Sequence, residues 1–381
     1  MKPTFLIAAI ASLALLAGCA GKVEPQNPPK ELRSFDARVG LETLWSQNAG
    51  SGLGRANYPI APAREGGLVF AADEGGRLMA FDAANGNRRW QQDLDVAVSS
   101  GLTAVAGEVY LGTRNGEVLA VDQNDGEVLW RARVPSEVLA APQANQALLV
   151  VQSVDGSVTA LDRASGDERW VYTSSQPSLS LRSNATPRVI DPVTFVGQPN
   201  GRLVTLDNRS GQPLMDMVIA VPRGRSDIER LVDLAGQPVL TPDGRLFVTS
   251  YNGRLVALVS TSGEVLWERE HSSYLTPIIV GDVLLTVDET SQILALNADN
   301  GNEIWRNSDL EGRRLTAPAF AGGNLVVGDF EGYLHLIDVR SGELTGRTRI
   351  DSSGISVRPL TEGRQIIVLA NDGRLEALDI R

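Results

Sequence analysis

Cysteine is almost absent from this chain: Cys19 is the only one among 381 residues. A single thiol cannot form an intramolecular disulfide, which excludes a small secreted fold held together by disulfides, and it cannot supply a cysteine-based zinc site. Histidine is scarce as well, with only His271 and His335. No HExxH, P-loop or GxSxG motif occurs. We therefore expect no cofactor or metal, and we interpret both histidines as residues of the core or of a strand surface.

Positive charge is also in deficit. The chain has 35 lysines and arginines against 46 aspartates and glutamates, which gives a net charge of -11. Binding to nucleic acid requires a surplus of positive charge facing the phosphates, so this class of partner is disfavoured. Attachment to an anionic membrane surface through a basic face is disfavoured for the same reason. The composition indicates an acidic globular body that would need a separate anchor at a membrane.

The N-terminus has the features of a targeting segment. Lys2 precedes an apolar, uncharged stretch over residues 4–18, which is too short to span a bilayer comfortably. The stretch ends in Leu-Ala-Gly-Cys, which resembles the lipobox of bacterial lipoproteins. We therefore predict a lipoprotein signal peptide over residues 1–18 and lipidation of Cys19. The alternative is an unmodified cysteine in an ordinary signal peptide.

The residues after Cys19 bear on the destination of the protein. Position 20 is Ala rather than the Asp that retains lipoproteins in the inner membrane, which predicts export to the outer membrane. Two or three acyl chains anchor a protein stably, whereas a single chain does so only marginally. Residues 21–30 are polar and rich in proline, so we expect residues 19–40 to be an acylated cysteine followed by a flexible tether. The folded body is expected over residues 41–381.

An internal repeat dominates the rest of the chain. Its pattern is Gly-x-x-x-Ala-x-Asp-x-x-x-Gly-x-x-x-Trp, with complete copies that begin at Gly76, Gly116 and Gly156. Degenerate copies begin at positions 201, 253, 291, 332 and 373. The average spacing of about 42 residues is typical of the four-stranded blades of β-propellers. Hairpin signals such as Asn115-Gly116 follow apolar strands within the copies. We predict an all-β fold, an eight-bladed β-propeller of four-stranded antiparallel blades.

The eighth copy of the repeat is incomplete, because the chain ends at Arg381 before a tryptophan strand can follow. A matching strand occurs at the other end of the chain, where residues 41–47 carry Trp45. The tryptophans of the protein all occupy this one repeat position: Trp45, Trp90, Trp130, Trp170, Trp267 and Trp305. We therefore predict that an N-terminal strand completes the C-terminal blade and closes the ring.

The repeated side chains allow more than one functional interpretation. The aspartates, for example Asp82 and Asp122, recur once per blade at a strand end, which is typical of acceptors in turns rather than of catalytic groups. The tryptophans resemble the docking motifs of pyrroloquinoline quinone dehydrogenases, which are eight-bladed too. Those enzymes carry a vicinal disulfide, which a chain with one cysteine cannot form. We expect a protein that is not an enzyme, with a quinoprotein dehydrogenase and a carbohydrate-binding or cell-wall-binding propeller as the alternatives.

Two intervals between repeats are unusually long, from 156 to 201 and from 201 to 253. The additional residues are expected in the blade-to-blade connections 174–187 and 223–238, which should be neighbours on one face. Exposed leucines beside charged groups are typical of a protein-docking patch, although long surface loops without a partner are the alternative. The candidate partner-binding residues are Leu179, Leu181, Arg182, Arg230 and Asp233.

Together these features resemble the BamB family, lipoproteins of the β-barrel assembly machinery. The resemblance rests on the lipobox, the eight repeats, the PSLSLR segment at 177–182 and the stretches 226–233, 325–338 and 351–359, and it covers essentially the whole chain. It implies a non-catalytic scaffold at the periplasmic face of the outer membrane. Such a scaffold binds the periplasmic POTRA domains of BamA within the Bam complex and assists the folding and insertion of β-barrel proteins.

The resemblance also implies which residues make the contacts. The LSLR element corresponds to Leu179, Leu181 and Arg182, and an acidic element corresponds to Asp233. The family often has a second acidic residue two positions further on, where this chain has Ala235. Unfolded outer-membrane β-barrel proteins are a further expected partner, by addition of a strand to a blade edge.

Overall fold

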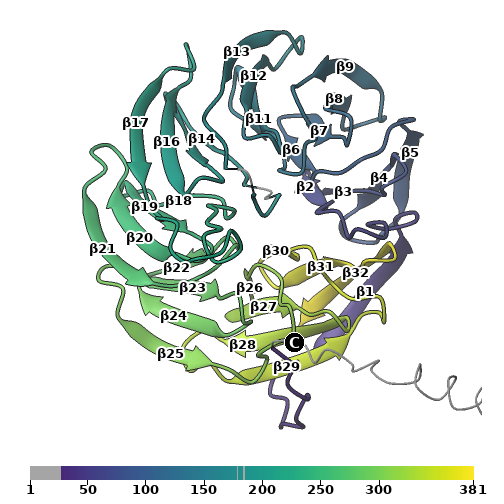
Figure 1. The fold of residues 1–381 in the computed structure, drawn as a ribbon. Coiled ribbons are helices and arrows are strands. Elements are labelled where there is room, and N and C mark those ends of the chain that lie inside the picture. The colour runs from purple at the N-terminus through teal and green to yellow at the C-terminus, as the bar shows by residue number, and fades with distance from the viewer. Residues whose placement is uncertain (1–26, 178, 183–184) are drawn as a thin grey trace, which may run out of the picture.

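The computed structural model describes residues 27–177, 179–182 and 185–381. The predicted signal peptide and Cys19 lie outside these described residues. Within them the chain forms strands only, from β1 to β32, and they assemble into eight antiparallel sheets of four strands each. Figure 1 shows the sheets arranged as blades around a ring. The predicted eight-bladed β-propeller is therefore confirmed.

Blades 1 to 7 each consist of four consecutive strands, which run in order from the centre of the ring to its rim (Figure 1). The strands of the first four blades are β2 (Ala63–Glu65), β3 (Leu68–Ala72), β4 (Arg77–Asp82) and β5 (Arg88–Asp93) in blade 1; β6 (Thr103–Val105), β7 (Glu108–Gly112), β8 (Glu117–Asp122) and β9 (Val128–Arg133) in blade 2; β10 (Gln143–Ala144), β11 (Leu148–Gln152), β12 (Val158–Asp162) and β13 (Glu168–Tyr172) in blade 3; and β14 (Arg188–Val189), β15 (Val193–Gly197), β16 (Arg202–Asp207) and β17 (Pro213–Val218) in blade 4.

The second half of the ring follows the same plan until blade 8, which takes its outer strand from the N-terminus. Its strands are β18 (Val239–Leu240), β19 (Arg245–Thr249), β20 (Arg254–Val259) and β21 (Val265–Glu270) in blade 5; β22 (Ile278–Val280), β23 (Val283–Val287), β24 (Ile293–Asn297) and β25 (Glu303–Asn307) in blade 6; β26 (Ala319–Ala321), β27 (Asn324–Gly328), β28 (Tyr333–Asp338) and β29 (Leu344–Arg349) in blade 7; and β30 (Leu360–Glu362), β31 (Gln365–Leu369), β32 (Arg374–Ile380) and β1 (Leu41–Asn48) in blade 8.

The middle strands of each blade are buried on both faces, because every blade packs between two others. In β8, the four residues from Val118 to Val121 are all fully buried. The outer strands alternate instead, and every residue of β21 is exposed or half-buried. The core consists of several clusters between neighbouring blades rather than one centre. Each blade is therefore stabilised mainly by its neighbours.

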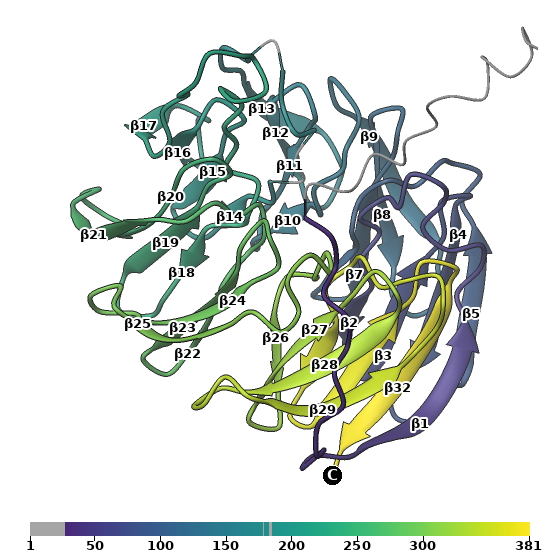
Figure 2. The same ribbon diagram turned by 60° about the horizontal axis from the view of Figure 1, so that its bottom comes forward.

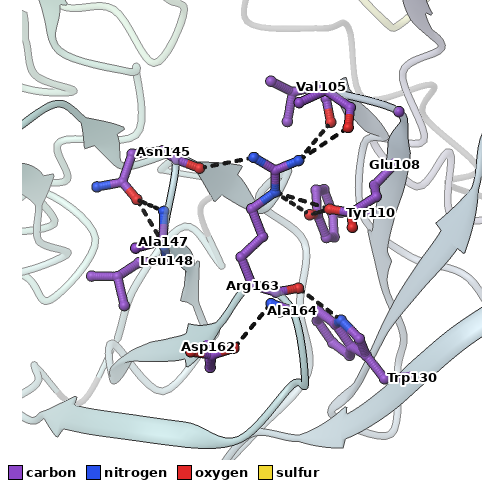
Figure 3. A network of polar contacts seen from close by, with 12 residues as sticks. Val105, Glu108, Tyr110, Trp130, Asn145, Ala147, Leu148, Asp162, Arg163 and Ala164 are labelled. Carbon is purple, nitrogen blue, oxygen red and sulfur yellow. Dashed lines mark hydrogen bonds and ion pairs between the residues drawn. The ribbon is translucent and has the colours of Figure 1, made fainter.

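Each tryptophan connects its blade to the next blade around the ring. Trp130 on β9 donates a hydrogen bond from Nε1 to the backbone oxygen of Arg163 at 2.9 Å (Figure 3). Its ring lies against Gly166, whose φ is +77° and where a Cβ would come within 2.7 Å of the ring. The other five tryptophans donate to the backbone oxygens of Ala83, Gln123, Asn208, Ala298 and Val339. The repeat therefore pairs a tryptophan with a glycine of the next blade.

Arg163 adds a polar contact between blades 2 and 3 (Figure 3). Its Nε donates to Oε2 of Glu108 at 2.9 Å and to the hydroxyl of Tyr110 at 2.8 Å, and its other nitrogens donate to the backbone oxygens of Val105 and Asn145 at 3.3 Å. Burial, and next the hydrogen bond to Glu108, raise the pKa of Tyr110, which keeps its proton. A half-buried guanidinium with this many acceptors stabilises the interface between the blades.

The repeated aspartates are acceptors in turns, as predicted. Oδ1 of Asp82 accepts hydrogen bonds from two backbone N–H groups of the following turn, at 3.0 and 3.2 Å. The same pair of bonds is made by Asp162, Asp207 and Asp338. Asp379 differs because the chain ends two residues later, and its carboxylate lies 3.4 Å from Arg364 instead. The recurrence of aspartate is thus explained by turn geometry.

The N-terminal strand closes the ring, as predicted. β1 pairs with β32 in an antiparallel register that runs from Leu41 opposite Ile380 to Asn48 opposite Arg374. Trp45 then donates to the backbone oxygen of Ala83 in blade 1 at 3.0 Å, like the other tryptophans. Figure 1 shows the purple β1 beside the yellow β32. Blade 8 is therefore built from both ends of the chain.

Residues 30–39 form a segment, called here the N-terminal strap, that lies along blade 7 (Figure 2). Lys30 donates from its backbone N to the backbone oxygen of Glu311 at 2.9 Å, and Val39 donates to that of Thr345 at 3.0 Å. The guanidinium of Arg347 lies over the ring of Phe35. The expected flexible tether over residues 19–40 thus differs in its last part, because Lys30 is bonded to the connection between β25 and β26, and Val39 to the open edge of β29.

Gly346 explains how the strap fits. It occupies the repeat position that holds tryptophan in other blades, and a Cβ on it would lie 2.7 Å from the backbone oxygen of Val39. A tryptophan there would occupy the space that the strap uses. Glycine therefore replaces tryptophan at position 346 because the strap passes there on its way to β1.

Both histidines are buried, in line with the prediction: His335 lies within β28, and His271 lies directly after β21, against blade 6. Nε2 of His335 lies 2.9 Å from Oδ2 of Asp329, which also accepts from Arg313 at 2.8 Å. Nε2 of His271 lies 2.9 Å from Oγ1 of Thr286. In the described part of the chain, no group of three or more His, Cys, Asp or Glu side chains could hold a metal ion. The same residues contain no helix long and apolar enough to cross a membrane.

His271 should make the stability of the fold depend on pH. Burial, and next the charge of Arg269, lower its pKa from 6.5 to about 4. The unfolded chain binds the proton more readily, so stability is complete above pH 6.5 and falls as the pH drops toward 4. We expect a loss of about 2 kcal/mol between pH 7 and pH 5 from this group. Urea unfolding of the wild type and of His271→Gln at both values measures the effect, and an equal pH dependence in the two proteins would contradict it.

Candidate functional site

The two long connections lie next to each other on one side of the ring. One joins β13 to β14 over residues 173–187, and the other joins β17 to β18 over residues 219–238. They lead into and out of blade 4, which lies across the ring from the closure between β1 and β32 (Figure 1). Residues of both connections line a shared cavity of about 480 Å³, among them Leu179 and Arg230. The predicted proximity of the two loops is therefore confirmed.

The first loop presents the LSLR element to solvent. Leu179 and Leu181 are both exposed, although neither is charged or polar. Arg182 has a φ of +52° and forms an ion pair with Glu137, which comes from the connection before blade 3. This ion pair fixes the guanidinium against the connection before blade 3 while most of the arginine side chain stays exposed. The loop therefore combines apolar anchors with an oriented positive charge.

The second loop contains a short turn that resembles the start of a helix. The Ser226 hydroxyl accepts from the backbone N of Glu229 at 3.2 Å, and the Glu229 carboxylate accepts from the backbone N of Ser226 at 3.2 Å. These reciprocal bonds form a capping box. The backbone hydrogen bonds from Arg225 and Ser226 lower the pKa of Glu229. Glu229 therefore shapes the loop and keeps its charge.

The capped turn directs Ile228 and Arg230 to the surface. Ile228 is 74% exposed, the largest exposed fraction among the large hydrophobic residues described. Arg223, Arg225 and Arg230 form no ion pair with any described residue. Unpaired arginines around an exposed isoleucine favour a partner that carries carboxylates around an apolar centre.

Asp233 lies elsewhere, in the interior. Its exposed fraction is 0%, and its backbone forms a bridge with Tyr251 at the end of β19, where the Tyr251 N–H donates to the Asp233 oxygen at 2.8 Å. Ala235, at the position where the family often has another acid, is buried too. The structure thus brings Leu179 and Arg230 to one cavity, leaves Leu181 and Arg182 exposed on the same loop as Leu179, and buries Asp233. Contact of Asp233 with a partner stays a prediction.

Two surface residues that the sequence analysis did not single out belong to the same region. These are Ile228 and Val221, which is also well exposed. Ile228 could have been found from the sequence, because it is the only apolar residue in the polar stretch from Arg223 to Arg230. Val221 comes soon after β17 in an apolar stretch, so the sequence alone does not show whether it is exposed or part of the core. We define the docking surface as Leu179, Leu181, Arg182, Val221, Ile228 and Arg230.

Comparison with known proteins shows the family to which these features correspond. A family model described as outer membrane protein assembly factor BamB matches residues 29–111, 74–307 and 289–381. A protein of that name from Pseudomonas aeruginosa is 46% identical over 376 residues, which cover 98% of each chain. The protein of that name from Escherichia coli is 34% identical over 385 residues, again covering 98% of each chain.

Solved structures with the same fold include an assembly factor and an enzyme. The crystal structure of BamB from Moraxella catarrhalis superposes with a TM-score of 0.82 at 23% identity, covering 89% of this chain and 100% of that one. A quinohemoprotein alcohol dehydrogenase from Comamonas testosteroni superposes with a TM-score of 0.68 at 14% identity, covering 89% and 76%. At these identities the likeness concerns the fold alone.

Proposed function

The chain belongs to the family of outer membrane protein assembly factor BamB, and from this membership we propose that it is a scaffold lipoprotein that binds the POTRA domains of BamA. The relatives that match over the full chain are named as an assembly factor, and the chain is accordingly an assembly factor rather than an enzyme. Within the Bam complex, its proposed task is to assist the folding and insertion of β-barrel proteins into the outer membrane.

The docking surface is the observation that carries the proposal. Leu179, Leu181 and Ile228 are exposed on two loops that also carry arginines, that share a cavity and that are longer than their equivalents between other blades. Large apolar side chains that cluster at a surface and are surrounded by charge are typical of the centre of a protein interface. The arginines favour a partner surface with carboxylates, which a domain of the barrel component would have to provide.

The ring contributes rigidity to this proposed role. The loops start and end on strands that are hydrogen-bonded within blades, and the middle strands of blade 4, β15 and β16, are buried between its neighbours. A surface that is held in shape before binding loses less conformational entropy when the complex forms. The scaffold would thereby orient a multidomain partner without doing any chemistry itself.

We also propose that Cys19 carries the lipid anchor and that the propeller faces the periplasm. Support comes from the lipobox-like sequence before Cys19, the Ala at position 20 and the absence of any other cysteine that could be modified. Mass spectrometry of the membrane fraction tests this part separately. Acyl chains on the residue-19 peptide would support it, and an unmodified thiol would contradict it.

Capture of BamA tests the docking proposal. The triple variant Leu179→Ala, Arg182→Ala, Ile228→Ala should recover at least tenfold less BamA from solubilised membranes than the wild type, because each residue of a hot spot contributes about 2 kcal/mol and about 1.4 kcal/mol is tenfold. The matched control is Leu129→Ala, Arg89→Ala, Ile304→Ala. It removes two exposed apolar side chains and one exposed, ion-paired arginine from the outer strands β9, β5 and β25. Unchanged capture by the first variant, or equal losses in both, would overturn the docking surface.

A further inference from the structure

A cavity of about 830 Å³ lies at the centre of the ring, separate from the docking surface. Its wall comes from the innermost strands of blades 4 to 8, which are β14, β18, β22, β26 and β30, and from the residues just before them. Figure 1 shows these strands around the centre of the ring. The volume falls within the range of about 300–1,000 Å³ that is usual for sites of small organic ligands.

The cavity holds two guanidinium groups that lack a protein partner. Arg188 is on β14, and Arg358 comes just before β30, so the two approach the cavity from opposite sides of the ring. Neither side chain forms a hydrogen bond or an ion pair with the described residues, and Nε of Arg188 is buried without an acceptor. Arg358 is exposed at the cavity, and the protein packed around its guanidinium lowers its pKa.

The third arginine of the cavity wall, Arg245, differs from the other two because its guanidinium is paired with carboxylates. Arg245 forms ion pairs with Asp243 at 2.8 Å and with Asp299 at 2.5 Å. Arg188 and Arg358 have no such carboxylates, although the protein as a whole carries a net charge of -11. The buried Nε of Arg188 without an acceptor destabilises the fold, and a second unpaired arginine, Arg358, faces the same cavity. The two together need an explanation beyond folding.

Most of the remaining wall is apolar; its polar members are Gln237, Thr241, Thr276, Thr361 and Asp243, whose carboxylate is paired with Arg245. Val239, Ile278, Ile279 and Phe320 face the same cavity, together with two prolines that precede the inner strands of blades 5 and 6. Guanidinium groups bind carboxylates and phosphates through paired hydrogen bonds, and an apolar wall favours a ligand with a hydrocarbon body. We propose that the central cavity is a binding site for an organic anion, in which Arg188 and Arg358 hold a carboxylate or phosphate group and the apolar wall holds its hydrocarbon body.

Calorimetric titration of the full chain with three probes of equal chain length tests the site. The probes are decanoate, decyl phosphate and decyltrimethylammonium, each below its micellar concentration. We expect one or both anions to bind with a dissociation constant of about 1 mM or lower, which corresponds to about −4 kcal/mol, and the cation not to bind. The comparison of decanoate with decyl phosphate identifies the preferred charged group.

Variants separate the proposed site from a general affinity for amphiphiles. Arg188→Gln combined with Arg358→Gln should weaken binding of the anion at least tenfold, whereas Arg209→Gln, an exposed arginine in the turn after β16, should leave it unchanged. Because the two guanidinium groups are unpaired, the double variant should unfold at the same temperature as the wild type or at a higher one. The proposal is overturned if no anion binds, if the cation binds equally well, or if the folded double variant keeps its affinity. BamA capture is expected to be unaffected, so this outcome is independent of the docking proposal.

Discussion

A chain that starts at Ala49, and therefore lacks β1, is expected not to form a closed propeller. Removal of β1 exposes the edge of β32, where Leu375, Ala377 and Leu378 are buried in the intact ring. It also removes Trp45 from its contact with blade 1. Loss of one buried tryptophan costs about 3–5 kcal/mol and exposure of a leucine about 1.5–3 kcal/mol, so the total approaches the net stability of an ordinary domain.

A circular permutant provides the matched control. Residues Gly40 and Arg381 already exchange backbone hydrogen bonds at 3.3 and 3.0 Å, so a two-residue turn can join them. The permutant that runs from 49 to 381 and then from 40 to 48 retains β1 and should unfold cooperatively in urea, monitored by tryptophan fluorescence. The truncated chain should aggregate or unfold without a sharp transition. A truncated chain as stable as the permutant would show that closure by β1 contributes little.

Gly166→Ala is expected to destabilise the protein far more than Gly107→Ala. Both glycines have positive φ, of +77° and +88°, so alanine is strained by about 1–2 kcal/mol at either position. Only Gly166 has a tryptophan ring within 2.7 Å of a Cβ, whereas nothing lies within 4 Å at Gly107. The ring of Trp130 is held by its hydrogen bond and cannot move away, which should add roughly 1–3 kcal/mol.

The loss of stability caused by Gly263→Ala should lie between the losses caused by Gly107→Ala and Gly166→Ala. The neighbours of Gly263 are the sulfur atoms of Met215 and Met217, at 2.6 and 2.7 Å from the Cβ position, and the methionine side chains can change rotamer. Free energies of unfolding in urea for the three single variants would therefore rank Gly107, Gly263 and Gly166 from the smallest loss to the largest. Equal losses at Gly107 and Gly166 would mean that the tryptophan contact does not contribute beyond backbone strain.

Most of the fold could be predicted from the sequence because the repeat contact is local in each copy. A tryptophan, an aspartate and a glycine recur at fixed spacing since one blade must meet the next in the same way each time. The exception at position 346 was visible as a missing tryptophan, but its cause was not. The strap that passes there has no alternating apolar pattern, and it is held by scattered backbone bonds that leave no mark on the sequence.

The docking surface was predicted only in part. The length of the two loops indicated its place, and Leu179, Leu181 and Arg182 do lie at the surface. Asp233 was named from the family resemblance as an acidic contact, although its neighbours in sequence, Val232 and Leu234, are apolar. It is buried because its backbone pairs with Tyr251 as the loop returns toward blade 5, a contact between residues that the sequence gives no reason to match.

The N-terminal strap limits how far the propeller can lie from a membrane in which Cys19 is anchored. Because Lys30 is bonded to the connection between β25 and β26, only eleven peptide units separate this fixed point from Cys19. An extended chain of that length reaches at most about 40 Å. If Cys19 is acylated as proposed, this short tether keeps the propeller close to the bilayer. Its docking loops then reach partners only within a limited distance of the membrane surface. The local concentration of any membrane-bound partner is raised accordingly, before a single contact forms.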